Sequence, residues 1–262
     1  MTIPFDINKN GNTPITNELS RQVDVDTDGY MPLEGLSIDS SNRARGVWYH
    51  PTPMRLIKGA LEHLDIDPAD YTFVDFGAGK GRVAMLAAEH GFRRVIGVEF
   101  AAEIHQIATR NLERLRARHA GLDRVEFLCM DAADFVPPPE PTVFYLFDPF
   151  DDVVLGRVVS NIQSSLARHP RPVLFVYMHP VHAHVFDELG VPRDQVHLVR
   201  LSLRDVPEMV LPHLGTSDPA RLSDFFRVIL QLDIAFPVRR LQRVIRSIGR
   251  SLGRRQRGPN SG

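Results

Sequence analysis

Apolar runs of strand length alternate with stretches of helical periodicity through the middle of this 262-residue chain. The apolar runs contain few polar residues, which predicts strands that are buried on both faces. Helices packed above and below a parallel sheet produce that burial, so the alternation predicts an α/β domain. The predicted strands are residues 71–76, 94–100, 124–130, 142–147 and 171–178. The predicted helices are residues 52–64, 81–90, 102–119, 152–167 and 183–189.

The two ends of the chain depart from this alternation. Residues 1–50 are rich in Asn, Asp, Thr, Ser and Gly and show little periodicity, so we expect an irregular segment or lid draped over the domain. Two further predicted strands, residues 195–203 and 226–232, have no clear helix directly joining them and could close the sheet antiparallel. The expected single domain therefore covers residues 51–236.

Residues 237–262 form a basic tail that contains eight arginines and no acidic residue. Apolar residues recur there at steps of three and four, which predicts an amphipathic basic helix. Contact with an anionic membrane surface, contact with nucleic acid and a solvated appendage are all compatible with this pattern. Basic tails are commonly appendages, so we favour the third interpretation. The apolar positions are Val238, Leu241, Ile245, Ile248 and Leu252.

The overall composition is that of a globular protein, with 43% hydrophobic residues, 24% charged residues and a net charge of −1. These values exclude a chain that is disordered or strongly basic throughout. The one cysteine, Cys129, excludes an intramolecular disulfide and a cysteine-based zinc site, and its apolar neighbours predict a buried thiol. No stretch resembles a secretory signal or a membrane span, so we expect a soluble cytoplasmic protein.

The segment FVDFGAGKGR, residues 73–82, reads as a strand followed by a glycine-rich turn and a helix. A dinucleotide-binding turn would have its third glycine at position 82, where this chain has Arg82. Asp75 also lies only two residues before Gly77, and its carboxylate would repel a pyrophosphate. The turn therefore disfavours an NAD-linked enzyme.

A cationic cofactor with an amino group fits the same turn better. S-adenosylmethionine carries an α-ammonium group that Asp75 could bind, while Gly77 and Gly79 let the backbone approach the ligand closely. Glu99 ends the second predicted strand and is placed for the two ribose hydroxyls, and Asp131 follows the third strand and suits the adenine amine. Three carboxylates at three successive strand ends predict one crevice at the carboxyl edge of the sheet.

The segments FVDFGAGKGR, VIGVEF, CMDAADF and YLFDPF resemble the first four motifs of class I S-adenosylmethionine-dependent methyltransferases. The segments VDTDGYMPLEGLSI and GVWYHPTP are similar to the N-terminal extension of a bacterial group within that family. The resemblance covers about residues 50–232 and implies a Rossmann-like seven-stranded, mostly parallel sheet with helices on both faces. The implied strand order is 3-2-1-4-5-7-6, with strand 7 antiparallel. The implied cofactor residues are Asp75, Gly77, Ala78, Gly79, Glu99, Phe100, Asp131 and Ala132.

The acceptor of the methyl group is expected beside YLFDPF, at the end of the fourth strand. Asp148 could accept hydrogen bonds from an amine, Pro149 would stiffen the turn, and Phe150 would offer an apolar wall. These three residues resemble the Asp/Asn-Pro-Pro-Tyr/Phe motif of amino-group methyltransferases, although the second proline is missing. We therefore expect a nitrogen acceptor, whether a protein lysine, a nucleobase or a small amine.

Histidines and an aromatic pair supply further candidates near the same edge. His179, His182 and His184 follow the fifth strand, but no matching carboxylate cluster accompanies them, so we expect pocket-lining residues and no metal site. Tyr49 and His50 precede the first helix and could cover the cofactor.

Two alternative functions remain open from the sequence. An aminopropyl transferase that uses decarboxylated S-adenosylmethionine would need the same turn, and a non-catalytic S-adenosylmethionine-binding module would keep the same acids. Specificity lies in loops and in the irregular N-terminal region, so the acceptor could be a protein, an RNA or a small molecule. The sequence does not predict an oligomeric state.

Overall fold

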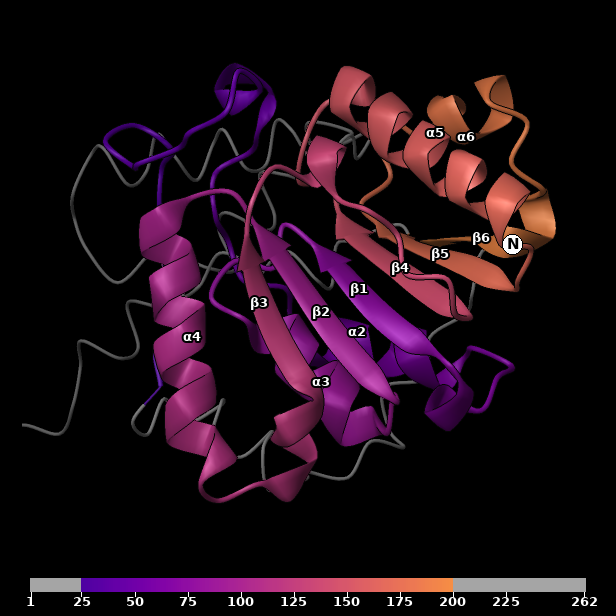
Figure 1. Cartoon of the computed structure of the whole chain (residues 1–262). Helices are drawn as coiled ribbons and strands as arrows, with labels where there is room; N and C mark the ends of the chain where they lie inside the picture. The colour runs from indigo at the N-terminus through magenta and orange to yellow at the C-terminus, as the bar shows by residue number, and fades with distance from the viewer. Residues whose placement is uncertain (1–24, 200–262) are drawn as a thin grey trace, which may run out of the picture.

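A computed structural model of the chain describes residues 25–199 as one α/β domain (Figure 1). Six strands form one sheet in the order β3-β2-β1-β4-β5-β6, and every neighbouring pair is parallel. The parallel α/β sheet is as the alternating pattern predicts, and the fold is Rossmann-like, as the family resemblance implies. The strands are β1 (Thr72–Phe76), β2 (Arg94–Glu99), β3 (Val125–Cys129), β4 (Thr142–Phe147), β5 (Val173–Met178) and β6 (Val196–Val199).

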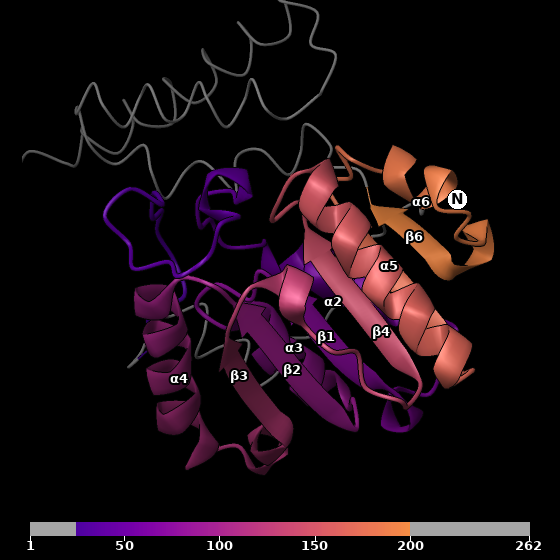
Figure 2. The same ribbon diagram turned by 45° about the horizontal axis from the view of Figure 1, so that its top comes forward.

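Helices cover both faces of the sheet (Figure 2). Alternate strand residues point to opposite faces, so Phe73 packs with α2 and α3 in one core cluster while Val74 packs with α5 and α6 in the other. The α-helices are α2 (Met54–Glu62), α3 (Arg82–His90), α4 (Ala102–Arg116), α5 (Asp152–Arg168) and α6 (His184–Glu188). The short 3-10 helices are η1 (Arg43–Arg45), η2 (Pro68–Asp70), η3 (Ala120–Arg124), η4 (Ala132–Asp134) and η5 (Arg193–Gln195).

Local sequence signals fix the ends of the helices that follow the site-forming strands. Gly81 precedes α3 and Gly91 follows it, and both adopt a left-handed backbone, with φ of 88° and 105°. Asp151 caps α5, because its side chain accepts a hydrogen bond of 3.1 Å from the backbone N–H of Val154. Because β1 and β4 are adjacent and parallel, the turns that lead from them into α3 and α5 lie at the same edge of the sheet.

The predicted strand order is wrong at one edge of the sheet. An antiparallel strand was expected between the fifth and sixth strands, but β6 pairs directly with β5 and is parallel to it, with Phe175 opposite Val196. The backbone of residues 196–199 already occupies the hydrogen-bonding edge of β5, which leaves no space for a strand between them. The strand predicted at residues 226–232, the end of the one predicted at 195–203 and the basic tail lie outside the described residues.

Two smaller predictions are also corrected. The helix expected over residues 102–119 ends at Arg116, because the chain turns into η3. Cys129 is exposed and not buried, since it ends β3, the strand at the edge of the sheet. Within residues 25–199, no helix has the length and apolar character needed to cross a membrane.

Candidate functional site

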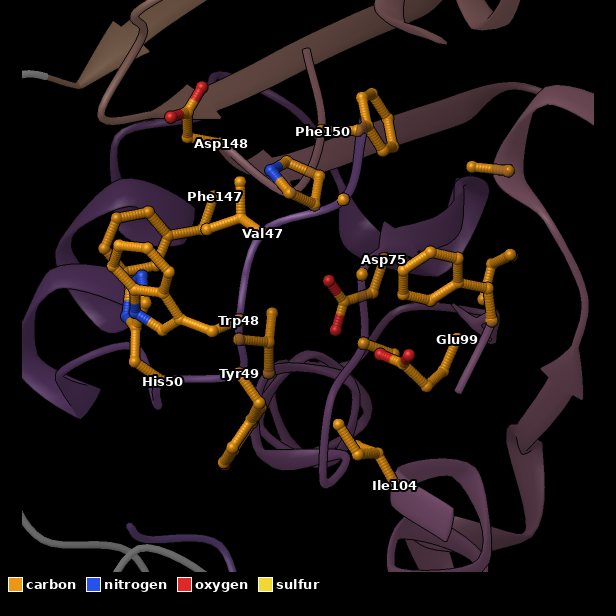
Figure 3. Close-up of a pocket in the computed structure, with 18 of the residues that line it drawn as sticks. Val47, Trp48, Tyr49, His50, Asp75, Glu99, Ile104, Phe147, Asp148 and Phe150 are labelled. Atoms are coloured by element: carbon orange, nitrogen blue, oxygen red, sulfur yellow. The ribbon is translucent and has the colours of Figure 1, made fainter. Parts of the chain in front are cut away.

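A cavity of about 920 Å³, counting its open mouth, lies at the carboxyl edge of the sheet (Figure 3). The ends of β1, β2 and β4 form one side of it, and residues 46–52, where the N-terminal segment meets the domain, form the other. The carboxyl edge beside a change in strand order is where parallel α/β sheets usually bind ligands. Of the residues expected to bind the cofactor or face the acceptor, all but Gly79 line this cavity.

The N-terminal segment is joined to the domain by backbone hydrogen bonds. The N–H of Val47 donates to the carbonyl of Pro149 at 3.0 Å, and Gly46 forms an antiparallel bridge with Phe150. A second bridge joins Met31 to Tyr49 within the segment. The segment therefore runs directly along the turn after β4, where the acceptor residues were expected.

The glycine-rich turn after β1 has the backbone that the sequence predicts. Gly77 and Gly79 have φ values of 75° and 55°, which other residues rarely adopt. A Cβ atom on Gly77 would lie 2.5 Å from Pro149, and one on Gly79 would lie 2.3 Å from the ring of Tyr49. The ring of Tyr49 covers Gly79, which explains why Gly79 itself does not line the cavity.

Two buried carboxyl groups flank this turn. Asp75 is 1% exposed and Glu99 is 5% exposed. The Oδ2 atom of Asp75 has no hydrogen-bond partner within the described part of the chain, whereas Glu99 accepts from the N–H of Gly79 at 3.0 Å and of Ala101 at 2.9 Å. Burial, together with the nearby Glu99, raises the pKa of Asp75 well above its usual value, and burial raises the pKa of Glu99 to about 7. A bound cation, or a ligand with hydroxyl donors, would offset the cost of burying these two carboxyl groups in their charged form.

Asp131 lies in the cavity wall but is already hydrogen-bonded. Its Oδ2 atom accepts from the Asn42 side chain at 2.8 Å and from the Ser40 hydroxyl, and its Oδ1 atom accepts from the N–H of Ala133 at 2.8 Å. The N-terminal segment is therefore tied to the residue that was expected to bind adenine.

Sequence reasoning missed the role of the two cations in the glycine-rich turn. The Nζ atom of Lys80 donates to Asp26 Oδ1 and to the carbonyl of Asp28, both at 2.7 Å. Arg82 donates to the Thr27 hydroxyl at 2.9 Å and forms an ion pair with Asp28. Both cations are buried. Their partners lie in VDTDG, so these contacts hold the N-terminal segment against the glycine-rich turn. The spacing of these acids gave no periodic signal that could have revealed the contact.

Asp148 follows β4 in a left-handed backbone conformation, with a φ of 45°. Its Oδ1 atom accepts a hydrogen bond of 2.7 Å from the hydroxyl of Tyr177, which lies on β5. Partial burial raises the pKa of Asp148, while the Tyr177 hydrogen bond and the neighbouring His179 and His182 oppose that rise. A non-glycine residue in this conformation at a strand end is typical of a functional position.

Aromatic side chains gather at the end of the cavity that lies away from Glu99. Figure 3 shows Trp48, His50 and Phe147 on that side, and the His50 and Phe147 rings meet edge to face with centroids 4.8 Å apart. The indole Nε1 of Trp48 is buried and has no hydrogen-bond partner among residues 25–199. Sequence analysis selected His50 but missed Trp48 and Phe147, although WYH and LFDPF place both next to the expected site.

The three histidines after β5 do not line the cavity. His179 packs edge to face on Phe147 at 6.5 Å between ring centroids, and the N–H of His182 donates to the Tyr177 hydroxyl at 3.3 Å. His179 and His182 therefore contact residues next to the expected acceptor position, and the prediction that the three histidines line the pocket is wrong. Within the described residues, no group of three or more His, Cys, Asp or Glu side chains is arranged to hold a metal ion.

A family model described as "Methyltransferase domain" matches residues 73–168. This segment contains the glycine-rich turn, Glu99, Asp131 and the Asp148 turn, which are the residues that meet in the cavity. Residues 73–168 are thus similar to a methyltransferase domain. The order β3-β2-β1-β4-β5 agrees with the first five positions of the order that the class I resemblance implies. No curated protein sequence matches the chain.

Solved structures of other methyltransferases are similar to the chain over part of its length. A methyltransferase from Geobacter sulfurreducens in complex with S-adenosylhomocysteine is 22% identical over 47% of this chain and 48% of its own, with a TM-score of 0.35. An RNA methyltransferase from Salinibacter ruber, also with S-adenosylhomocysteine, is 22% identical over 48% and 78%, with a TM-score of 0.32. A putative methyltransferase from Methanococcus maripaludis is 12% identical over 69% and 76%, with a TM-score of 0.37. The chain thus spans about half the length of the first of these structures.

Proposed function

We propose that the protein is an S-adenosylmethionine-dependent methyltransferase that acts on a nitrogen acceptor. The observation that supports the cofactor most directly is the Oδ2 atom of Asp75, which is buried beside the glycine-rich turn with no hydrogen-bond partner in the described part of the chain. Buried carboxylates in proteins are normally paired, and an ammonium group is the partner that this atom would accept. Bound S-adenosylmethionine would supply an activated methyl group on a sulfonium sulfur.

The residues around the cavity fit this cofactor. Asp75 would hold the α-ammonium group, and Gly77 and Ala78 would let the ligand approach the backbone. Glu99 would accept hydrogen bonds from the ribose hydroxyls, and Gly79 would act through the hydrogen bond that its N–H donates to Glu99. Phe100, Asp131 and Ala132 would surround the adenine. The Oδ2 atom of Asp131 already accepts from Asn42 and Ser40, so these residues of the N-terminal segment would lie beside the adenine. Residues 1–50 would accordingly form a lid over residues 51–236.

The acceptor side would need to orient the nitrogen and hold its proton. Asp148 offers a carboxylate at the end of β4, and Tyr177 fixes that carboxylate by a hydrogen bond of 2.7 Å. Pro149 and Phe150 are held in place by backbone contacts with Val47 and Gly46. This arrangement supports an amine nitrogen that approaches between Asp148 and the aromatic residues.

Calorimetric titration with S-adenosylmethionine tests the cofactor. We expect binding by the parent protein and by Asp134→Asn, whose carboxylate is exposed and outside the cavity, and much weaker binding by Glu99→Ala. Failure of the parent protein to bind would contradict the proposal. Titration with decarboxylated S-adenosylmethionine distinguishes an aminopropyl transferase, because such an enzyme would bind that ligand more tightly.

Incubation with labelled S-adenosylmethionine and fractionated lysate tests the activity. Label in protein, RNA or small molecules would identify the class of acceptor. A protein that binds the cofactor and transfers no label in any fraction would be a binding module and not an enzyme. Fractions from the cytoplasm are the natural starting material, because a cytoplasmic location is what the sequence predicts.

A further inference from the structure

The aromatic end of the cavity has features that the cofactor residues leave unexplained. Trp48, His50 and Phe147 lie on the side of the cavity away from Glu99, and Asp148 follows Phe147 in the chain (Figure 3). The indole Nε1 of Trp48 is buried there without a hydrogen-bond partner in the described residues. A buried donor of this kind requires an acceptor atom, which a bound ligand would provide.

The charges that line the cavity favour a positively charged ligand. Four carboxyl groups line it, and among the described lining residues Arg82 is the one permanent cation. Arg82 is already paired with Asp28. The four carboxyl groups belong to Asp75, Glu99, Asp131 and Asp148.

The cofactor would use three of these four groups. Asp75 and Glu99 flank the glycine-rich turn, and Asp131 is hydrogen-bonded to Asn42 and Ser40. Asp148 is the carboxylate that remains for the acceptor. One of its oxygens accepts from Tyr177, so the group keeps capacity for a further donor.

The surroundings of the mouth disfavour a nucleic-acid acceptor. Phosphate groups bind to accessible Lys and Arg side chains. Two arginines, Arg43 and Arg45, precede the cavity-lining residues of the N-terminal segment, and both already have partners. Arg45 forms an ion pair with Asp151 at 2.6 Å. Arg43 donates to the carbonyls of Leu33 and Leu36 at 2.8 Å. Within residues 25–199, the entrance beside Asp148 therefore presents aromatic rings and acids.

We propose that Trp48, His50, Phe147 and Asp148 form the acceptor subsite and that this subsite binds an alkylammonium group. Before transfer the ammonium nitrogen gives one proton to Asp148; its freed lone pair then takes the methyl group from the sulfonium sulfur, and S-adenosylhomocysteine leaves. The ring faces attract the cation through their quadrupoles, Asp148 accepts its N–H hydrogens, and the indole Nε1 of Trp48 donates to an oxygen of the same molecule. A lysine side chain in a protein and a free alkylamine share this chemistry. The inference rests on the proposed methyltransferase function, because it assigns the acceptor of that reaction.

Trp48 is the single tryptophan of the chain, so its fluorescence reports on this subsite directly. The protein is first saturated with S-adenosylhomocysteine, with binding checked by calorimetry. It is then titrated with n-butylammonium, with the neutral 1-butanol of similar shape, and with adenosine. We expect a saturable change in Trp48 emission with n-butylammonium, and no saturable change with the two neutral compounds.

A second comparison tests the carboxylate. Asp148→Asn keeps the left-handed backbone, which asparagine adopts readily, and keeps an oxygen for the Tyr177 hydroxyl. This variant should bind n-butylammonium about tenfold more weakly, whereas Asp134→Asn should bind it normally. Nα-acetyl-lysine N-methylamide separates the two sources: tighter binding than n-butylammonium indicates a protein lysine, and weaker binding indicates a free amine.

Three results would overturn the inference. These are saturable binding of adenosine in preference to the ammonium ion, no saturable response to either amine probe, and unchanged ammonium affinity in Asp148→Asn. Failure of the proposed function is distinguishable, because it appears before any amine is added. The protein would then either fail to bind S-adenosylhomocysteine by calorimetry, or bind the cofactor and transfer no label in any lysate fraction.

Discussion

Asp75 and Glu99 lie on adjacent parallel strands, both are buried, and the charge of Glu99 adds to the rise in the pKa of Asp75. Two acids buried this close together are unfavourable in the free protein. A cationic ligand would be attracted by both acids and would offset their mutual repulsion. The pair therefore favours ligand binding at the expense of the stability of the free protein.

Replacement of Asp75 by asparagine should therefore weaken S-adenosylmethionine binding. The amide keeps the shape of the side chain but cannot pair with an ammonium group, so we expect a loss of about 10- to 100-fold in affinity. Calorimetric titration measures the effect, with Asp134→Asn as the matched control. Unchanged affinity in Asp75→Asn would show that the ammonium group binds elsewhere.

Glu99 should make the stability of the cofactor-free protein depend on pH. Its pKa is about 7 in the folded protein and 4.5 in its usual state. Well below pH 4.5 the Glu99 carboxyl group is protonated in both the folded and the unfolded state, so burying it costs no charge and the protein keeps its full stability. As pH rises towards 7 the unfolded chain loses the proton first, so stability falls, by at most about 3 kcal/mol.

The matched variant for this effect is Glu99→Gln, which cannot ionise. Urea unfolding between pH 4.5 and pH 8 should show a smaller decline for Glu99→Gln than for the parent protein. Parallel pH profiles for the two proteins would mean that burial of Glu99 does not raise its pKa.

The ion pair between Arg82 and Asp28 should stabilise the fold more than a surface pair does. The Arg82 side chain is 8% exposed, so Asp28→Asn leaves a buried guanidinium without its charged partner. We expect a loss of about 1–3 kcal/mol in the free energy of unfolding, reduced from a fully buried case because Asp28 is 45% exposed.

The control is Glu126→Gln, whose partner Arg94 is 48% exposed. That substitution should lower the free energy of unfolding by less than about 1 kcal/mol. Urea unfolding measures both effects. Equal losses of unfolding free energy in the two variants would contradict a structural role for the contact between the N-terminal segment and the glycine-rich turn.

The strands and the cofactor carboxylates could be predicted because each carries a local signal. Residues 143–147 are a continuous apolar run, and β4 spans Thr142–Phe147, the predicted bounds. Asp75 and Glu99 were found because an acid at the end of a buried strand is unusual, and parallel strands bring such ends together.

The contacts of the N-terminal segment could not be predicted in the same way. Asp26 and Lys80 are 54 residues apart, and the segment that carries Asp26 has no periodicity from which a packing direction follows. The sheet edge was mispredicted for a related reason. A short run such as residues 196–199 does not encode which strand it pairs with. The prediction therefore relied on the strand order implied by the family, which places another strand between the fifth and the sixth, whereas β6 pairs directly with β5.

Gly79 should tolerate no side chain, in contrast to Gly156 on α5. A Cβ atom on Gly79 would collide with the Tyr49 ring and would require a strained φ of 55°, whereas one on Gly156 meets no atom within 4 Å. Gly79→Ala should displace Tyr49, disturb the hydrogen bond between the Gly79 N–H and Glu99, and weaken cofactor binding more than about tenfold. Gly156→Ala should bind normally and be more stable by up to about 1 kcal/mol. Calorimetry and urea unfolding of the two variants make the comparison, and normal binding by Gly79→Ala would contradict it.

Tyr177 should set the pH range in which Asp148 binds a cation. Its hydroxyl donates to Asp148 at 2.7 Å and lowers the pKa of that carboxyl group, against the rise caused by burial. In Tyr177→Phe the hydrogen bond is lost, so the pKa of Asp148 should rise further and the carboxylate should be protonated at a higher pH. The affinity for n-butylammonium, followed by Trp48 fluorescence, should then fall at a higher pH than in the parent protein. Tyr71→Phe, which changes a tyrosine outside the cavity, should leave the profile in place. A profile for Tyr177→Phe that moves to lower pH would mean that Tyr177 does not stabilise the ionised form of Asp148.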